Sequence, residues 1–192
     1  MILGSHNSWS YLPARKWWMK PIAFMAKCQS VDIKTQYEMG VRCFDLRLRF
    51  NKYGLGVVVH GIVEYCYTAS KIYEDLAWLN EKGDCCVRVI HEVRSAKQYK
   101  SRDIHRFRSF CSAIEHDYRY IHFWCGRNLF CWGYDYHFSG AEPTCEERYA
   151  SVSSPRLIDD WWPWLYARLH NKKIREQGTD KEILLIDYVD IK

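Results

Sequence analysis

Four short stretches of this chain end strand-like apolar runs in side chains that can move protons or hold an anion. They are residues 4–8 (GSHNS), 43–47 (CFDLR), 57–61 (VVVHG) and 89–92 (VIHE). If the runs form neighbouring strands, two histidines, a guanidinium and carboxylates meet at one end of a sheet. Such a set is suited to proton transfer around an anionic phosphodiester.

The individual residue types fit separate tasks. A histidine has an unperturbed pKa of about 6.5, so His6 and His60 can each serve as acid or base near neutral pH. Arg47 lies two residues after Asp45, on the same face of an alternating strand. A buried unpaired charge is costly, which favours a paired network of these two residues. Without such context, an exposed or simply hydrogen-bonded histidine and a structural salt bridge remain the alternatives.

Hydrophobic periodicity, together with glycine and proline residues that end helices and strands, predicts the elements that would position these residues. Residues 41–50 alternate: Cys43, Asp45 and Arg47 share one face, and Phe44, Leu46 and Leu48 share the other. The same signals predict further strands at 2–4, 57–60, 85–93, 118–125 and 183–187. They predict helices at 13–27, 33–39, 68–82, 101–115 and 155–177, the last disturbed at Pro163. Residues 126–155 are loop-rich.

Alternating strands and helices predict an α/β fold with a parallel sheet and a single domain over residues 1–192. The apolar outer face and polar inner end of residues 41–50 are what a barrel strand needs. Hydrophobic content of 48% and charged content of 27% are ordinary for a globular protein. An aromatic share of 16% indicates an aromatic-rich core, with sugar stacking or membrane anchoring as further uses.

Charge and cysteine content narrow the class of partner and the compartment. The net charge of +5 is mild and forms no dense basic stripe, which suits an anionic lipid or phosphorylated substrate and argues against nucleic acid. Nine cysteines without regular spacing indicate free buried thiols in a reducing compartment. No signal peptide or membrane span is visible. We expect a cytoplasmic or peripheral membrane protein, or a secreted one if an upstream signal has been removed.

The order of these motifs resembles the catalytic X region of phosphatidylinositol-specific phospholipases C. The resemblance runs from Ile2 to Arg94 and resumes at the last strand, residues 182–190. It implies a TIM-type (β/α) barrel, which at this length should be compact and incomplete. It also implies that His6 is the general base for the inositol 2-hydroxyl, that His60 is the general acid for the glycerol oxygen on the opposite side of the phosphorus, and that Arg47 contacts the phosphate.

Further roles follow from the same resemblance. Asp45 would orient a histidine or Arg47, and Asp187, with Asp190 as competitor, would orient His6. Glu92, chosen over His91 by strand alternation, would line the substrate site. A set of three residues, Arg127, Trp132 and Tyr134, would line the sugar pocket.

Asn7 departs from the bacterial pattern of this family. Bacterial members carry Asp at this position, behind the acid histidine, whereas calcium-dependent members carry Asn as a metal ligand. Arg47 instead follows the bacterial pattern, and a guanidinium and a calcium ion neutralise the same phosphate. We therefore expect no cofactor, with calcium held by Asn7, Asp45 and Glu92 as the alternative.

The resemblance implies an enzyme that cleaves phosphatidylinositol-type lipids to a cyclic inositol phosphate and a glycerol lipid. Trp17 and Trp18, flanked by basic residues, would contact the membrane, although packing on the barrel is equally compatible with the sequence. Two other functional hypotheses remain. One is a weak or inactive phospholipid-binding module with the same fold, and the other is a metal-dependent phosphodiesterase for another head group.

Overall fold

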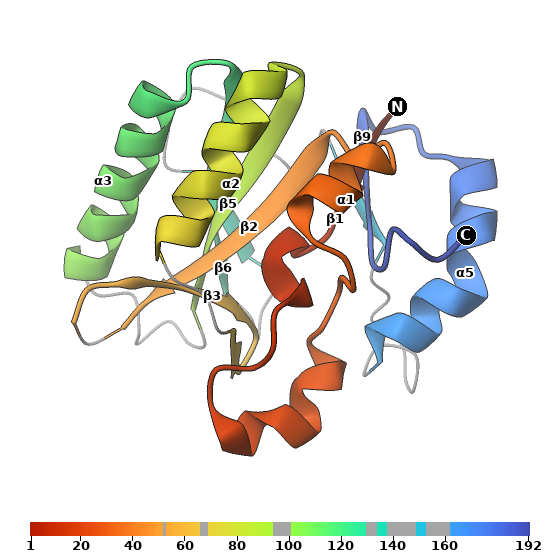
Figure 1. The fold of residues 1–192 in the computed structure, drawn as a ribbon, viewed down its shortest axis with the longest axis horizontal. Coiled ribbons are helices and arrows are strands. Elements are labelled where there is room, and N and C mark those ends of the chain that lie inside the picture. Colours follow the sequence, from red (N-terminus) through yellow and green to blue (C-terminus); the bar gives the residue numbers. More distant parts are fainter. Residues whose placement is uncertain (52, 66–68, 94–100, 130–133, 138–148, 153–161) are drawn as a thin grey trace.

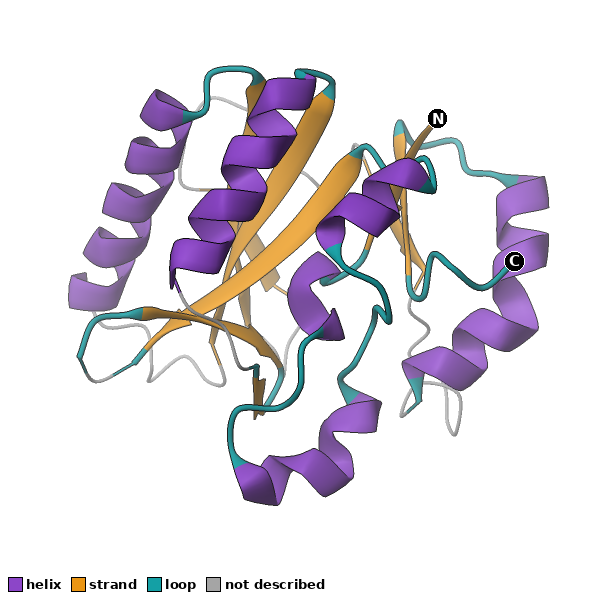
Figure 2. Cartoon of the chain, viewed as in Figure 1, coloured by secondary structure: helices purple, strands orange, loops and turns teal. Residues whose placement is uncertain are grey.

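The structure, a computed structural model, is described here for residues 1–192 except residues 52, 66–68, 94–100, 130–133, 138–148 and 153–161. The strands are β1 (Ile2–Ser5), β2 (Cys43–Phe50), β3 (Gly56–His60), β4 (Val63–Glu64), β5 (Cys85–Val93), β6 (Ile121–Leu129), β7 (Tyr134–His137), β8 (Tyr149–Val152) and β9 (Ile183–Ile186). The α-helices are α1 (Ile33–Glu38), α2 (Ala69–Lys82), α3 (Ser101–Asp117) and α5 (Pro163–Gln177). Two 3-10 helices, η1 (Ser8–Tyr11) and η2 (Trp17–Met25), follow β1. Figure 2 shows these helices arranged around the sheet.

The sheet has the strand order β7-β6-β5-β2-β1-β9-β8. Neighbours from β6 to β8 along this order are parallel, and β7 is antiparallel to β6. Within the described residues the two ends of the order, β7 and β8, do not pair. The fold is therefore a mixed α/β architecture of the TIM-barrel type with an incomplete barrel, as the sequence predicted.

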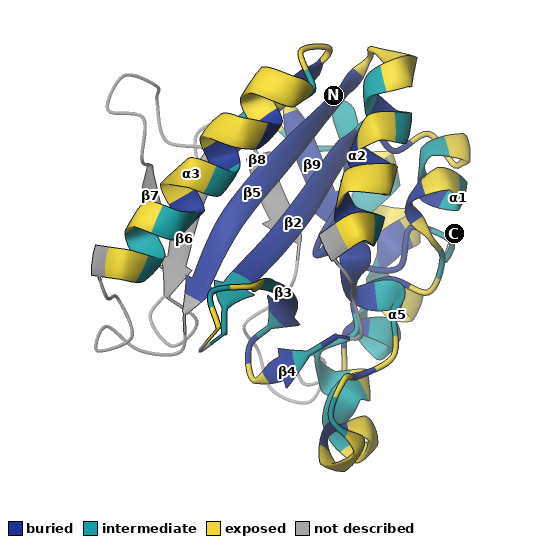
Figure 3. Cartoon of the chain, turned by 60° about the vertical axis from the view of Figure 1, so that its left-hand side comes forward, coloured by how far each residue is buried: buried dark blue, intermediate teal, exposed yellow. Residues whose placement is uncertain are grey.

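The alternation in β2 separates two packing layers. Phe44, Leu46 and Leu48 are fully or almost fully buried in the large core beneath the helices. The helices contribute apolar stripes to this core, which include Ile72, Leu76 and Leu79 of α2 and Phe107, Cys111 and Ile114 of α3. Cys43 faces the opposite side of the sheet and packs in a smaller cluster with Cys86 and Trp124. Figure 3 shows the exposed faces of α2 and α3 turned away from the buried sheet.

Glycine is required at one point of the central sheet. β1 lies between β2 and β9, with Gly4 paired to both Cys43 and Leu185. A Cβ added at Gly4 would overlap the Leu185 side chain and press on Cys43. The absence of a side chain therefore lets β1 sit close to both neighbours and carry His6 to the sheet end.

Several predicted elements need correction. Residues 13–27 do not form an α-helix, because Pro21 lies inside η2 and removes a backbone donor. Pro163 does not disturb a helix but occupies its first turn, where a missing N–H costs nothing. Strand β6 begins at Ile121, three residues later than predicted. The loop-rich prediction for 126–155 missed β7 and β8.

One strand direction also differs from the prediction of a parallel sheet. β3 is antiparallel to β2, with Leu48 opposite Val58. The intervening turn is too short for the crossover that parallel strands need. The hairpin folds back at the carboxyl end of β2, where Figure 1 places β3 beside η1, and it ends at His60.

Among the described residues, the free cysteines are Cys28, Cys43, Cys85, Cys86 and Cys111, and each is buried, as the composition indicated. Among the described helices, none has both the length and the apolar character needed to cross a bilayer.

Candidate active site

His6 is held at the carboxyl end of β1 by the neighbouring strand β9. Its Nδ1 lies 2.8 Å from Asp187 Oδ1, and the ring is 4% exposed. The parallel register pairs Ser5 with Ile186, so the next residue of each strand end falls side by side. Asp190, the other carboxylate considered for this role, instead accepts a hydrogen bond from Ser30. The Asp187 contact makes Nδ1 the protonated nitrogen and leaves the lone pair on Nε2.

Asp45 and Arg47 form the centre of a buried ion network. Arg47 Nε donates to Asp45 Oδ2 at 2.7 Å, and Arg47 Nη1 donates to Glu92 Oε2 at 2.8 Å. Arg88 Nη1 donates to Asp45 Oδ1 at 3.2 Å, and the backbone N–H of Asn7 donates to Asp45 Oδ2 at 2.9 Å. The phosphate-facing cation predicted at Arg47 is therefore fixed between two carboxylates.

Electrostatics keep this network charged. Burial acts to raise the pKa of the Asp45 carboxyl, but the guanidiniums of Arg47 and Arg88 outweigh burial and hold that pKa below its usual value. Burial also opposes ionisation of Glu92, and Arg47 lowers its pKa in the same way. The two carboxylates in turn raise the pKa of Arg47 well above normal, against the effect of burial.

Glu92 connects Arg47 to the hairpin that carries His60. Its Oε1 accepts a hydrogen bond from the backbone N–H of Gly61. Arg49 spans the same junction, because it donates to the backbone oxygens of Glu92 and Gly61. His91 lies on the other face of β5, stacked on Phe107 in the outer core. The alternation that favoured Glu92 over His91 thus matches the placement of both side chains.

His60 lies at the end of β3, directly beside His6. The two ring centroids are 5.2 Å apart and the planes are nearly perpendicular, at 88°. His60 Nδ1 is 2.8 Å from the backbone oxygen of Ala26 and 3.4 Å from Cys28 Sγ. Burial lowers the pKa of His60, and the positive charge of Arg47 adds to this effect, while Glu92 opposes it.

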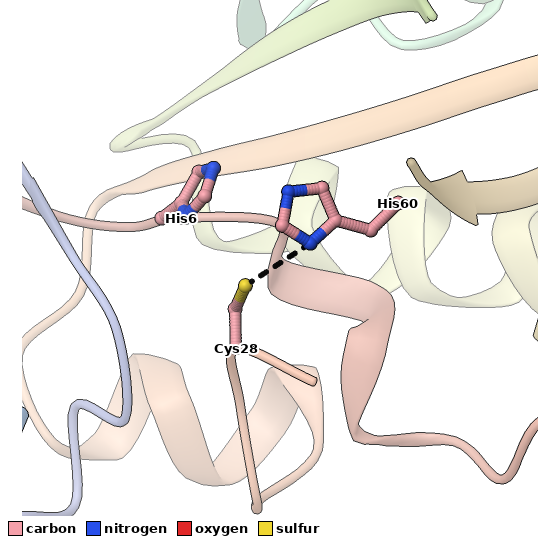
Figure 4. Close-up of side chains that lie close together, drawn as sticks. All are labelled: His6, Cys28 and His60. Atoms are coloured by element: carbon pink, nitrogen blue, oxygen red, sulfur yellow. Dashed lines mark hydrogen bonds between the residues drawn. The ribbon is translucent and has the colours of Figure 1, made fainter. Parts of the chain in front are cut away.

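Figure 4 shows how the histidine pair lies. The sequence predicted two imidazoles on opposite sides of one phosphorus, whereas the rings of His6 and His60 touch edge to face. A phosphodiester would therefore lie across the ring edges in this arrangement, or the rings would have to separate to admit it between them. Sequence reasoning missed Cys28, which points from below toward His60.

Asn7 occupies an unusual backbone position. Its φ of 44° and ψ of 56° are left-handed, a region that asparagine tolerates better than most residues. The residue is fully buried, and neither atom of its side-chain amide has a partner among the described residues. His60 is bonded to Ala26 and Cys28 instead of to Asn7. The support of the acid histidine that its family position implied is thus absent from the described contacts.

Gln29 is a second residue that the sequence did not single out. Its amide nitrogen donates to the backbone oxygens of His6 and Ile186, and its amide oxygen accepts from Val189. It therefore ties the His6 loop to the end of β9. Gln29 and Cys28 lie in a connection without motif or periodicity, so no sequence signal marked them. Arg88 does carry a signal, because its spacing of four residues from Glu92 in an alternating strand puts both on one face.

Two of the predicted sugar-pocket residues lie in β6 and β7, beyond β5 in the sheet order, and the third lies outside the described residues. Arg127 is in β6, with its backbone opposite His91 and Tyr136, and Tyr134 begins β7. Their side chains are not described. Trp132 lies outside the described residues.

The oxygen atoms considered for calcium are already engaged. Both carboxylate oxygens of Asp45 and both of Glu92 accept from a guanidinium or a backbone N–H. Only the buried amide of Asn7, among these three residues, is without a partner in the described structure. A calcium ion would have to displace Arg47 or Arg88 to gain carboxylate ligands.

Comparison with known proteins adds a fold assignment. No family model and no curated protein matches the chain. The phosphatidylinositol-specific phospholipase C from Listeria monocytogenes matches with a TM-score of 0.64 and 16% identity, covering 97% of this chain and 87% of that chain. A single-residue variant of the Staphylococcus aureus phosphatidylinositol-specific phospholipase C gives 0.65 and 16%, covering 97% and 84%. Another structure of that enzyme, from work on modulation of its membrane binding, gives 0.59 and 15%, covering 97% and 85%.

The matches cover nearly the whole chain. This protein therefore has the fold of the bacterial phosphatidylinositol-specific phospholipases C.

Proposed function

We propose that this chain is a phosphodiesterase that cleaves the glycerol–phosphate bond of phosphatidylinositol-type lipids. The observation that carries the proposal is the meeting of His6, His60 and Arg47 at the carboxyl end of the sheet. His6 is oriented by Asp187, and Arg47 is fixed by Asp45 and Glu92. The fold of the phospholipases C supports the same substrate class.

The proposed reaction is an internal displacement at phosphorus. His6 Nε2 takes the proton of the inositol 2-hydroxyl, and the oxygen attacks the phosphorus to form a cyclic inositol phosphate. The bond between phosphorus and the glycerol oxygen breaks, and His60 gives that oxygen a proton, so that the second product is a glycerol lipid. Arg47 has two nitrogens bonded to carboxylates, and its Nη2 is the group we assign to the non-bridging phosphate oxygens.

We further propose that turnover needs no metal ion. The guanidinium of Arg47 supplies the positive charge that a calcium ion would otherwise bring to the phosphate. The carboxylates that could hold calcium are bonded to Arg47, Arg88 and backbone N–H groups. This arrangement supports the metal-free reaction over the calcium-dependent one and over a metal-dependent phosphodiesterase for another head group.

The surface next to the site suits contact with a membrane. Trp17 is 80% exposed, Trp18 50% and Phe24 47%, all on η2. Arg15 and Lys20 are exposed on either side of the tryptophan pair. Figure 1 shows η2 projecting at the end of the molecule where β3 and η1 lie. We propose that this segment inserts its aromatic side chains at the lipid interface, which would make the protein a peripheral membrane protein.

The test is turnover of phosphatidylinositol vesicles with and without a chelator. We expect no loss of turnover with the chelator and a decrease of at least about a hundredfold in His60→Ala, the usual worth of a positioned general acid. His116→Ala is the matched control, because the His116 side chain is 75% exposed on α3 and remote from the site. Equal rates in the parent and His60→Ala would reject the role of His60, and loss of turnover with the chelator would point to a metal-dependent reaction.

A non-catalytic phospholipid-binding module is the second candidate function. The observation that favours it is the environment of His60, whose Nδ1 bonds to a neutral backbone oxygen. Burial lowers the pKa of His60, so few molecules carry the acidic proton at neutral pH. Vesicle binding that survives both His6→Ala and His60→Ala, with no turnover in the parent, would select this alternative.

A further inference from the structure

Three metal-ligand side chains come together where the histidine pair meets the loop after η2. One ligand atom from each of His6, Cys28 and His60 lies within 4.8 Å of the others. Figure 4 shows the thiol and the two rings converging from three separate segments. Cys28 Sγ and His60 Nδ1 are 3.4 Å apart. In a tetrahedral zinc site, a sulfur and a nitrogen ligand lie about 3.5 Å from one another, given their usual bond lengths to the metal.

We propose that His6, Cys28 and His60 form a binding site for Zn²⁺, with the fourth position open to water or to a phosphate oxygen. Imidazole and thiolate ligands bind zinc, a borderline-soft ion, in preference to calcium or magnesium, which prefer oxygen ligands. The site is thus distinct from the oxygen-rich calcium alternative, which would use Asn7, Asp45 and Glu92. Three protein ligands with one open position is also the usual coordination of an accessible zinc ion.

The surroundings of the three ligands fit a bound cation. Asp187 accepts a hydrogen bond from Nδ1 of His6, and a carboxylate is a usual partner of a metal-binding histidine. This contact leaves a lone pair on Nε2 for the metal ion. Burial, and then the Asp187 carboxylate, raise the pKa of the Cys28 thiol, so zinc must displace the thiol proton. The same carboxylate would add negative charge beside a bound metal ion. Cys28 and His6 are buried, whereas His60 is partly exposed and gives the ion a route from solvent.

Binding requires a defined redistribution of protons. The Cys28 thiol releases its proton to solvent when sulfur donates an electron pair to zinc. His60 gives up its Nδ1–H contact with Ala26, and its remaining proton moves to Nε2. No electron transfer is involved, and no ligand changes its oxidation state.

Zinc at this position would inhibit the protein instead of assisting it. Both imidazoles would donate their lone pairs to the ion, so neither could serve the phosphodiester. This consequence rests on the proposed function, whereas the binding of zinc does not. Turnover should then fall as zinc is added and return when a chelator removes it.

Cobalt(II) titration tests the site directly, because Co²⁺ replaces zinc and absorbs light. We expect the parent to show thiolate-to-cobalt charge transfer in the ultraviolet and the visible bands of four-coordinate cobalt, both lost when zinc is added. Cys28→Ser should lose the charge-transfer band and bind zinc at least tenfold more weakly, and His60→Ala should lose the four-coordinate spectrum. Cys111→Ser, at a buried cysteine of α3 in the helix-side core, is the matched control.

Two results would overturn the site. One is a parent protein without thiolate-to-cobalt absorption, and the other is absorption that persists in Cys28→Ser. Far-ultraviolet circular dichroism and thermal melts of each variant, together with Cys28→Ala as a second variant, separate a lost ligand from a lost fold. Zinc inhibition of phosphatidylinositol turnover, measured against each variant's own metal-free rate, completes the test. Metal binding without turnover would reject the proposed function alone, and turnover without metal binding would reject the zinc site alone.

Discussion

At the scale of single residues, the hydrogen-bond partners of His60 decide how it can act. Its Nδ1 bonds to the neutral backbone oxygen of Ala26, not to a carboxylate. A carboxylate partner would stabilise the imidazolium and raise its pKa, whereas burial lowers the pKa of His60 here. The protonated form is therefore a stronger acid than an ordinary imidazolium and is populated at lower pH.

This shift predicts a pH profile for the proposed reaction. His60 must carry its proton to act as the general acid, and its pKa lies below the ordinary value of 6.5. Turnover should therefore fall as pH rises through that lowered pKa, whereas the His6 base must be unprotonated to act. The profile between about pH 5 and pH 8 should thus be bell-shaped, with His60 setting its alkaline limb. The measurement is kcat for vesicle substrate across this range, with any residual rate of His60→Ala as the reference. A rate that climbs steadily to pH 8 would show that the proton on His60 does not limit the reaction.

Local sequence patterns account for the placement of part of this candidate site. Alternation along β5 selected Glu92 over His91, and the end of β9 made Asp187 a candidate partner of His6. Cys28 could not be found in the same way, because it reaches His60 from an irregular connection that follows a 3-10 helix. The contact between the two rings also depends on the hairpin of β3, which no local pattern specified.

At the scale of elements, η2 shows how a proline redirects an apolar segment. Residues 13–27 carry enough apolar side chains to predict an amphipathic helix, but Pro21 lies inside and the segment forms a 3-10 helix. Met19 is buried beneath it, while Trp17 and Trp18 remain on the outside. The sequence could identify the aromatic pair, but only the structure shows that it is exposed.

The exposure of η2 predicts a role in lipid binding that can be separated from folding. Trp17→Ala should weaken binding to phosphatidylinositol-containing vesicles by at least about tenfold, because a buried aromatic side chain contributes about 1.5–3 kcal/mol. The unfolding midpoint should hardly change, since Trp17 is 80% exposed. Vesicle sedimentation measures the first quantity and thermal denaturation the second.

Tyr120→Ala is the matched control for this experiment. Tyr120 is 72% exposed and directly precedes β6, at the amino-terminal end of the parallel strands. Its substitution should leave vesicle binding unchanged. Equal weakening by both substitutions would mean that η2 is not the lipid-contacting surface.

At the scale of the whole molecule, the buried ions couple stability to pH. Arg47 joins β2 to β5 through Glu92, and Asp45 joins β2 to the loop after β1 through the Asn7 backbone. The folded-state pKa values of Asp45 and Glu92 lie below their ordinary values of 3.8 and 4.5. The unfolded chain therefore binds more protons than the folded chain when pH falls through this range, and stability is lost.

His60 acts in the same direction at higher pH. Its folded pKa is also depressed, so the unfolded state gains protons first as pH falls below 6.5. The free energy of unfolding should thus be greatest at neutral pH, begin to fall below about pH 6.5, and fall most steeply below about pH 4.5, where the two carboxyls titrate in the unfolded state.

Arg47→Met tests this coupling, because it removes the shared cation and leaves Asp45 and Glu92 with weaker compensation. We expect a loss of about 3–5 kcal/mol at pH 7, the usual cost of breaking a buried ion pair from one side. The loss should shrink toward pH 4, since carboxyls without the Arg47 cation take up protons more readily and no longer bury an unpaired charge. Arg42→Met is the control, because its pair with Asp84 is partly exposed and should contribute at most about 1 kcal/mol. Urea unfolding of both variants across this pH range measures the two losses. Equal losses at pH 7 would contradict the coupling, because the buried network would then contribute no more stability than an ion pair at the surface.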